Sequence, residues 1–314
     1  MAPISIIIPV RNEGMRLIAT IRSIVAGRSC VFPLEFVIVD DASSDGACDA
    51  LNSQLSGEDD VRLVIRRLPE WSGIPFARNR GAELATSPIY FITDANTLFP
   101  PQWDEPIWRH FDPRRMLAAT IIDMASPFHG YGCQLLLPSM GVTWIPVPFA
   151  YGGQVPVSPC TGSVIDRALF HHLGGYDESL PVYGAAEPEF SVRLWLSGYE
   201  IVNVPELQIR HRFRPRAEHD AYRDSIRTIL LRNYLRFACY YLPLNRLEQT
   251  YTHYASASSQ EFSACMEEIV AQGVWARRSE LSRLPYQFEW LVHRFGMDTA
   301  NTEAKASKSH SRFG

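Results

Sequence analysis

Short apolar runs recur along the first hundred residues, and each ends in polar or acidic residues. They cover residues 4–9, 36–39, 63–65 and 90–92. Runs of this length with polar boundaries predict buried β-strands. Segments with helical spacing lie between them, at residues 15–25 and at residues 73–85. The alternation predicts an α/β fold with a mostly parallel, doubly wound central sheet flanked by helices.

The ends of these strands carry the polar residues of interest. In a parallel sheet the carboxyl ends of the strands meet at one rim, where ligands bind. Pro9, Asp40 and Asp94 are therefore expected to line one crevice although they lie far apart in the chain. Asp94 and Asn96 would offer two oxygen ligands to a divalent cation. The alternative for a strand-end Asp is that it caps the next helix.

Residues 126–160 differ from the rest because they contain six prolines. Proline at this density disfavours central strands, so we predict an ordered loop over the crevice. Trp144 in this loop is the candidate to contact an acceptor. The alternative is that the aromatic residues of the loop cover the sheet.

The character of the chain changes again after Pro215. Helical patterns at residues 218–241, 259–271 and 277–295 predict a helical C-terminal extension over residues 216–296. The main domain would then be residues 1–215. Residues 297–314 are small and polar and predict a disordered tail. The first of these helices has a basic side formed by Arg223, Arg227, Arg232 and Arg236. We favour ion pairing or solvation of this side over binding of phosphate, an acceptor or a membrane surface.

Composition excludes several classes of function. The 314-residue chain has a net charge of −4, so it offers no basic footprint for nucleic acid. Its six cysteines lack paired spacing, which argues against a zinc site or a disulfide framework and favours reduced thiols. The chain opens on a strand, and its apolar stretches are interrupted. These features predict a cytoplasmic protein without a transmembrane segment, although peripheral membrane contact stays open.

Several polar segments occur in a familiar order. These segments are residues 9–13, 39–46, 77–81, 93–96, 162–167, 174–178, 183–195 and 211–214. With them the chain resembles family 2 glycosyltransferases, which have the GT-A fold, over residues 3–214. Its second half is also similar to the polypeptide N-acetylgalactosaminyltransferases. The resemblance implies transfer of a sugar from a nucleotide diphosphate sugar, with uridine favoured, assisted by Mn²⁺ or Mg²⁺. The acceptor would be a glycan, a lipid-linked sugar or a peptide.

The resemblance assigns metal ligands at three positions. Asp94, Asn96 and His211 match the family's metal-binding residues. Asn96 stands where the family usually has Asp or His, so one neutral oxygen replaces a charged ligand. We therefore expect weaker metal affinity than in a site with two carboxylates.

The resemblance also assigns residues to the nucleotide sugar. Pro9, Arg11 and Glu13 would form the loop under the uridine, and Ala95 would lie beside the donor. Asp40 would accept the N–H of the uracil ring. Arg78 would pair with the base or a phosphate, because a planar cation suits both. The alternative is a structural ion pair between Asp40 and Arg78.

The catalytic base is assigned in the same way. Inverting family members carry two adjacent carboxylates before a helix, and here these positions are Ala186 and Glu187. Glu187 is therefore the predicted general base. Glu189 is the second candidate for the base, and it would otherwise hold the acceptor or orient Arg193.

Three other functions stay open from the sequence. The polypeptide N-acetylgalactosaminyltransferases retain the anomeric configuration and need no such base, which would leave Glu187 as a binding residue. A nucleotidyltransferase would share the crevice but bind triphosphates. A non-catalytic nucleotide-sugar binder is compatible with Asn96 and Ala186.

Overall fold

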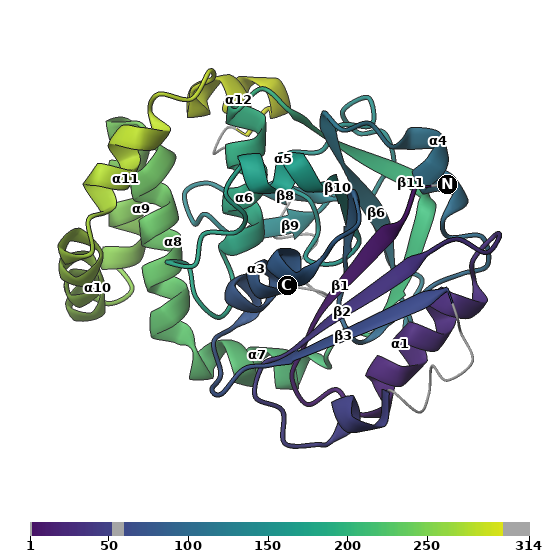
Figure 1. Ribbon diagram of the computed structural model, residues 1–314. Helices are drawn as coiled ribbons and strands as arrows, with labels where there is room; N and C mark the ends of the chain where they lie inside the picture. The colour runs from purple at the N-terminus through teal and green to yellow at the C-terminus, as the bar shows by residue number, and fades with distance from the viewer. Residues whose placement is uncertain (1, 52–59, 298–314) are drawn as a thin grey trace.

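The computed structural model describes residues 2–51 and 60–297, and its centre is one large mixed sheet (Figure 1). The strands follow in the order β3 (Val61–Arg67), β2 (Leu34–Asp40), β1 (Ile4–Val10), β4 (Ile89–Ile92), β10 (Ser163–Asp166), β6 (Arg115–Asp123), β11 (Glu200–His211) and β5 (Thr97–Leu98), and β7 (His129–Gly130) pairs with β6. The half from β3 to β4 is parallel throughout. In the other half, β10 runs antiparallel to both of its neighbours, whereas β11 is parallel to β6. The predicted α/β fold is confirmed.

Helices cover both faces of the sheet, which explains why its strands are apolar on both sides. Ile4, Ile6 and Ile8 of β1 share a core with α1 (Met15–Ala26) and α4 (Glu105–His110). Ile7 belongs to a second core on the opposite face, together with α3 (Ile74–Leu84), α5 (Arg167–His172) and α6 (Ala186–Leu196). A short 3₁₀ helix, η1 (Ala47–Ala50), follows β2.

The proline-rich segment packs into the fold along part of its length. It forms β7 and an antiparallel pair of short strands, β8 (Cys133–Leu135) and β9 (Val142–Trp144). Leu137 and Met140, between these strands, are buried in the second core. Tyr151 packs edge-on against Phe295 of the C-terminal region, with 5.3 Å between the ring centroids, and it does not line the crevice.

The C-terminal helices occupy the green and yellow end of the colour scale in Figure 1, and most of them lie to one side of the sheet. They are α7 (Arg216–Ser225), α8 (Arg227–Tyr241), α9 (Leu244–Ala255), α10 (Ser259–Ala271), α11 (Val274–Leu281) and α12 (Phe288–Phe295). Three details differ from expectation: the first predicted helix breaks at Ile226, α9 was not expected, and the last predicted helix is two helices separated near Pro285. Met297 is fully buried, and the rest of the predicted disordered tail, residues 298–314, lies outside the described residues.

The basic side of α8 faces α10. Arg227 pairs with Glu261, and Arg232 pairs with Glu268 at 2.5 Å. The preferred explanation of this basic side, ion pairing, is thus confirmed for these two residues. Within residues 2–51 and 60–297, no helix combines the length and the hydrophobicity that crossing a bilayer requires.

Candidate active site

A crevice of about 1680 Å³ opens beyond the carboxyl ends of β1 and β4. Folding gathers most of the predicted site residues on its wall: Pro9, Arg11, Glu13, Asp94, Ala95, Asn96, Trp144, Glu187 and His211. Three predicted residues, Asp40, Arg78 and Glu189, do not line it. The strand-end argument therefore located the crevice, and the three exceptions are described below.

Asp94 lines the crevice, two residues after the end of β4. Its backbone N–H donates to Thr161 Oγ1 at 2.9 Å, which fixes the turn that follows the strand. The pairing of β11 with β5 brings His211 beside it, so that His211 Nε2 lies 3.6 Å from Asp94 Oδ2. Burial alone would raise the pKa of Asp94, but His211 and the guanidinium of Arg78 outweigh burial and lower it. Asp94 is therefore a carboxylate.

Asn96 completes a set of donors that fits a divalent cation. Its side-chain N–H donates to the carbonyl of Arg212 at 3.1 Å, which orients the amide. The amide oxygen is buried and has no hydrogen-bond partner, and the same holds for His211 Nδ1. A carboxylate, a carbonyl oxygen and an imidazole form a mixed oxygen and nitrogen set of the kind that first-row divalent cations accept. Only two members of this set, Asp94 and His211, are of the usual ligand types. Within the described chain, no group of three His, Cys, Asp or Glu side chains could hold a metal ion.

Arg78 has a different environment from the one predicted. It is fully buried, and its Nη1 donates to Glu187 Oε1 at 2.6 Å while its Nη2 lies 3.3 Å from Asp94 Oδ1. Nη2 also donates to the carbonyl of Cys160. Burial opposes the charge of Arg78, but the carboxylates of Glu187 and Asp94 overcome it and raise the pKa of the guanidinium. Arg78 thus ties the predicted base to the predicted metal ligand, and it neither lines the crevice nor pairs with Asp40.

Asp40 also occupies a structural position. Only 4% exposed, it accepts the N–H of Ser43 at 2.8 Å and lies 3.4 Å from Arg67 Nε. The neighbouring Asp41 lines the crevice instead, and it accepts the N–H groups of Ser72 and Gly73 at the start of α3. The prediction that Asp40 faces the base is therefore not met, because successive residues at a strand end point to opposite sides.

Two loops form the rim under the predicted uridine. The N–H of Asn12 donates to Ser43 Oγ at 3.0 Å, and the N–H of Gly14 donates to Asp45 Oδ2 at 2.7 Å. Asn12 and Gly14 both have a φ above +50°, which brings the first loop close to the second. Hydrogen bonds between the loops thus fix the rim.

Sequence reasoning missed an aromatic residue on the same rim. Trp71 is 42% exposed, and its ring stacks with the guanidinium of Arg11, whose carbon lies 4.8 Å from the ring centroid. Arg11 also donates to the carbonyl of Asp41 at 3.2 Å. The available signal was a Trp followed by Ser-Gly, because the exposure of the ring cannot be seen in the sequence. The pair offers a flat, positively charged face to whatever lies on the rim.

Glu187 and Glu189 both lie on α6, but their environments differ. Glu187 lies in the first turn and faces the crevice with 12% of its side chain exposed. Glu189 is fully buried, bridges to Arg193 at 2.7 Å and accepts the hydroxyl of Tyr241 at 2.6 Å. The predicted acceptor contact of Glu189 is wrong, and its alternative role, orienting Arg193, is confirmed.

Aromatic side chains also line the crevice. Trp144 makes edge-on contacts with Phe128 and Phe213, and Phe213 packs 4.4 Å from the ring of His211. The C-terminal helices add further rings that sequence reasoning did not assign to the site: Tyr222, Tyr234, His253 and Tyr254. The wall can therefore contact a sugar face or an apolar acceptor group.

Comparison with known proteins gives a consistent result. Residues 5–136 match the model of the family described as glycosyl transferase family 2. Polypeptide N-acetylgalactosaminyltransferase 8 of Drosophila melanogaster is 28% identical over 253 residues, which are 75% of this chain and 43% of that protein. Polypeptide N-acetylgalactosaminyltransferase 16 of Mus musculus is 26% identical over 68% of this chain and 40% of that protein. The chain thus spans less than half the length of these relatives.

Solved structures extend the likeness to nearly the whole chain. The structure of GalNAc-T7 with UDP, GalNAc and Mn²⁺ has a TM-score of 0.72 at 18% identity, covering 96% of this chain and 58% of that one. The mannosyltransferase PcManGT from Pyrobaculum calidifontis, in complex with GDP-Man and Mn²⁺, has a TM-score of 0.56 at 18% identity, covering 98% of this chain and 87% of that one. These likenesses establish the fold. The predicted resemblance to family 2 glycosyltransferases and the GT-A fold are confirmed.

Proposed function

We propose that this chain is a glycosyltransferase that moves a sugar from a uridine diphosphate sugar to an acceptor hydroxyl. The observation that carries the proposal is Asp94, held at a strand end 3.6 Å from His211 in the crevice. A crevice of about 1680 Å³ exceeds the usual size of a site for one small ligand, so it has room for both donor and acceptor. The family match over residues 5–136 supports the same reaction class.

A divalent cation would be held by Asp94 Oδ, Asn96 Oδ1 and His211. The unpartnered Asn96 oxygen supports this assignment, since a buried carbonyl without a partner is costly unless it has a ligand. When bound, the cation would neutralise the negative charge that grows on the departing diphosphate. Both structural neighbours described above contain Mn²⁺, which favours that ion over Mg²⁺.

The rim of Pro9, Arg11 and Glu13 would hold the nucleoside, with Trp71 as an additional contact. Uridine is favoured because the neighbour with the higher TM-score contains UDP, whereas PcManGT contains GDP-Man. Because Asp40 does not line the crevice, backbone groups and the Arg11–Trp71 pair would recognise the nucleobase. Ala95 lies on the crevice wall beside the ligand set.

For the stereochemistry, we favour retention of the anomeric configuration over the inversion predicted from the sequence. A base must accept a proton, and Glu187 would then lose its pairing at 2.6 Å with a fully buried arginine. The cost of leaving that guanidinium with Asp94 alone opposes the step. The names of the polypeptide N-acetylgalactosaminyltransferase relatives agree with a peptide acceptor. The retaining route is what the resemblance to these enzymes implies. Inversion with Glu187 as base stays the second candidate, because Glu187 does face the crevice.

The test combines a donor panel with product analysis. The protein is incubated with UDP- and GDP-sugars, Mn²⁺ and threonine-containing peptides, and the anomeric configuration of the product is read by NMR. An α-linked product from an α-linked UDP donor supports retention, whereas a β-linked product supports Glu187 as base. In the inverting case Glu187→Gln should reduce turnover by about two to four orders of magnitude. Donor binding without transfer or hydrolysis under any of these conditions would instead indicate a non-catalytic binder.

A further inference from the structure

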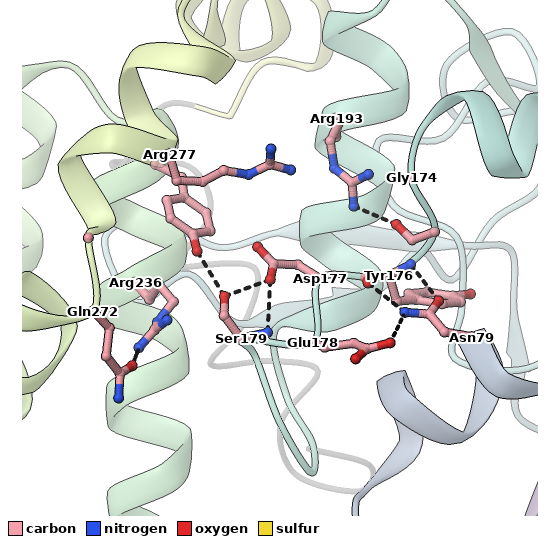
Figure 2. Close-up of a pocket in the computed structure, with 13 residues that line it drawn as sticks. Asn79, Gly174, Tyr176, Asp177, Glu178, Ser179, Arg193, Arg236, Gln272 and Arg277 are labelled. Carbon is pink, nitrogen blue, oxygen red and sulfur yellow. Dashed lines mark hydrogen bonds between the residues drawn. The ribbon is translucent and has the colours of Figure 1, made fainter.

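A second cavity, of about 430 Å³, lies outside the crevice. One wall is the loop of residues 174–179, and the other is formed by α8 and by the turn between α10 and α11 (Figure 2). The cavity reaches the size of known small-ligand sites. Its lining is mostly polar and includes Asp177, Ser179, Arg236, Tyr240 and Arg277.

Two of the three arginines that line this cavity, Arg236 and Arg277, have few partners, whereas the third, Arg193, pairs with Glu189. Arg236 is only 4% exposed; it donates to the side-chain oxygen of Gln272, and its Nε has no hydrogen-bond partner. Within the described part of the chain, the ion pairs of the structure include none between Arg236 and a carboxylate. Among residues 2–51 and 60–297, the one ion pair of Arg277 is with Glu280, at 3.0 Å, and that carboxylate is 63% exposed. A buried guanidinium with an unused donor indicates a place for an anion.

The acidic residues of the wall offset only part of this charge. Glu178 is engaged by Arg80 and by the side chain of Asn79. Asp177 accepts two hydrogen bonds from Ser179, and both use Oδ1. Figure 2 shows the side chain of Asp177 extending from the loop, with its second oxygen directed away from Ser179. That oxygen can accept a hydrogen bond from a hydroxyl group.

The start of α11 adds a third positive element. Gly273 lines the cavity and precedes the helix with a φ of +79°, and no side chain caps the helix. The first turn also lacks an acidic residue. The N-terminal N–H groups of such a helix attract negative charge.

We propose that this cavity binds a small phosphorylated ligand of about the size of a sugar phosphate. The phosphate would contact Arg236, Arg277 and the start of α11, and the ligand's hydroxyl groups would donate to Asp177. The occupant would touch the loop that also carries Tyr176, whose ring lies 5.4 Å from the guanidinium carbon of Arg78. Tyr176 therefore connects the proposed site to Arg78, the residue that joins Asp94 and Glu187.

The test measures binding by calorimetry, without any glycosyl donor, so its outcome does not depend on the proposed transfer activity. Inorganic phosphate and a hexose 1-phosphate are titrated into the full chain at constant chloride. Arg277→Gln and Arg236→Gln should each weaken phosphate binding by about tenfold or more, because each removes charge-assisted hydrogen bonds. Glu280→Gln, which frees Arg277 from its partner, should bind phosphate at least as tightly as the wild type. Arg283→Gln, an exposed arginine outside the cavity lining, is the matched control and should be unchanged.

Each outcome decides part of the proposal. Phosphate binding that Arg277→Gln leaves unchanged, or no phosphate binding at all, overturns it. Because Arg277 is partly exposed and lies at the surface, this variant remains informative if Arg236→Gln does not fold. Tighter binding of the hexose 1-phosphate than of phosphate, abolished by Asp177→Asn, supports the sugar phosphate. Equal affinities overturn the hydroxyl contact and restrict the site to the phosphate group.

Discussion

The bridge formed by Arg78 should contribute measurably to stability. Arg78→Met keeps the apolar stem of the side chain and removes the guanidinium, which leaves Asp94 and Glu187 without their shared cation. Removing one partner of a buried ion pair costs about 3–5 kcal/mol. The side chains of Asp94 and Glu187 are 21% and 12% exposed, so water offsets part of that cost. We expect a loss of about 2–4 kcal/mol in the free energy of unfolding.

For a chain of this length, that loss corresponds to a decrease of about 3–7 °C in Tm, from a typical unfolding entropy per residue. Calorimetry and urea unfolding would measure it. Arg80→Gln is the matched control, since Arg80 is on the same helix but pairs with Glu83 and Glu178 at the surface, where such pairs contribute about 0–1 kcal/mol. The double variant Arg78→Met/Glu187→Gln should recover part of the loss, with a coupling energy of about 1–3 kcal/mol. A loss below about 1 kcal/mol, or no coupling with Glu187, would refute the reasoning.

Three further changes test other parts of the structure. Asn96→Asp adds a second carboxylate to the ligand set and should tighten Mn²⁺ binding by about tenfold or more, measured by titration; unchanged affinity would remove Asn96 from the site. Glu189→Gln leaves the buried Arg193 without its carboxylate and should cost about 3–5 kcal/mol by urea unfolding, whereas a loss below 1 kcal/mol would contradict the burial argument. Burial opposes the charge of Glu35, but hydrogen bonds from Ser5 and Thr86 outweigh burial and lower its pKa. Ionised Glu35 therefore stabilises the fold above the ordinary pKa of a glutamate, and this contribution is lost as the pH falls through the lowered pKa. The difference in Tm between wild type and Glu35→Gln should therefore shrink below about pH 4, and a pH-independent difference would contradict this assignment.

The sequence was sufficient for features that depend on neighbouring residues. Apolar runs ending in polar residues located β1, β2 and β4, and with them the crevice that contains Asp94. The boundary of α10 was also predictable, since Ser258 accepts the N–H of Glu261 as an N-cap. Asn96 and His211 were located by motif order, and the pairing of β11 with β5 then explains why they meet.

Features that depend on orientation could not be predicted in this way. Asp40 and Asp41 are adjacent in sequence, and the side of the strand end that each faces is set by the pleat. Glu187 and Glu189 are two positions apart on a helix, so they point in nearly opposite directions, one to the crevice and one to the core. The partner of Arg78 lies 109 residues further along the chain, and no local pattern relates the two.

The continuity of the second core has a consequence for anyone who handles this protein. Leu235 and Phe237 of α8 are completely enclosed in the same apolar interior as Ile7 and Phe190, and Met297 closes the far end of that interior. A fragment trimmed to the region that matches the glycosyltransferase family would expose this interior and should precipitate or bind chaperones. Expression, domain exchange and directed evolution should therefore treat residues 2–297 as one indivisible unit.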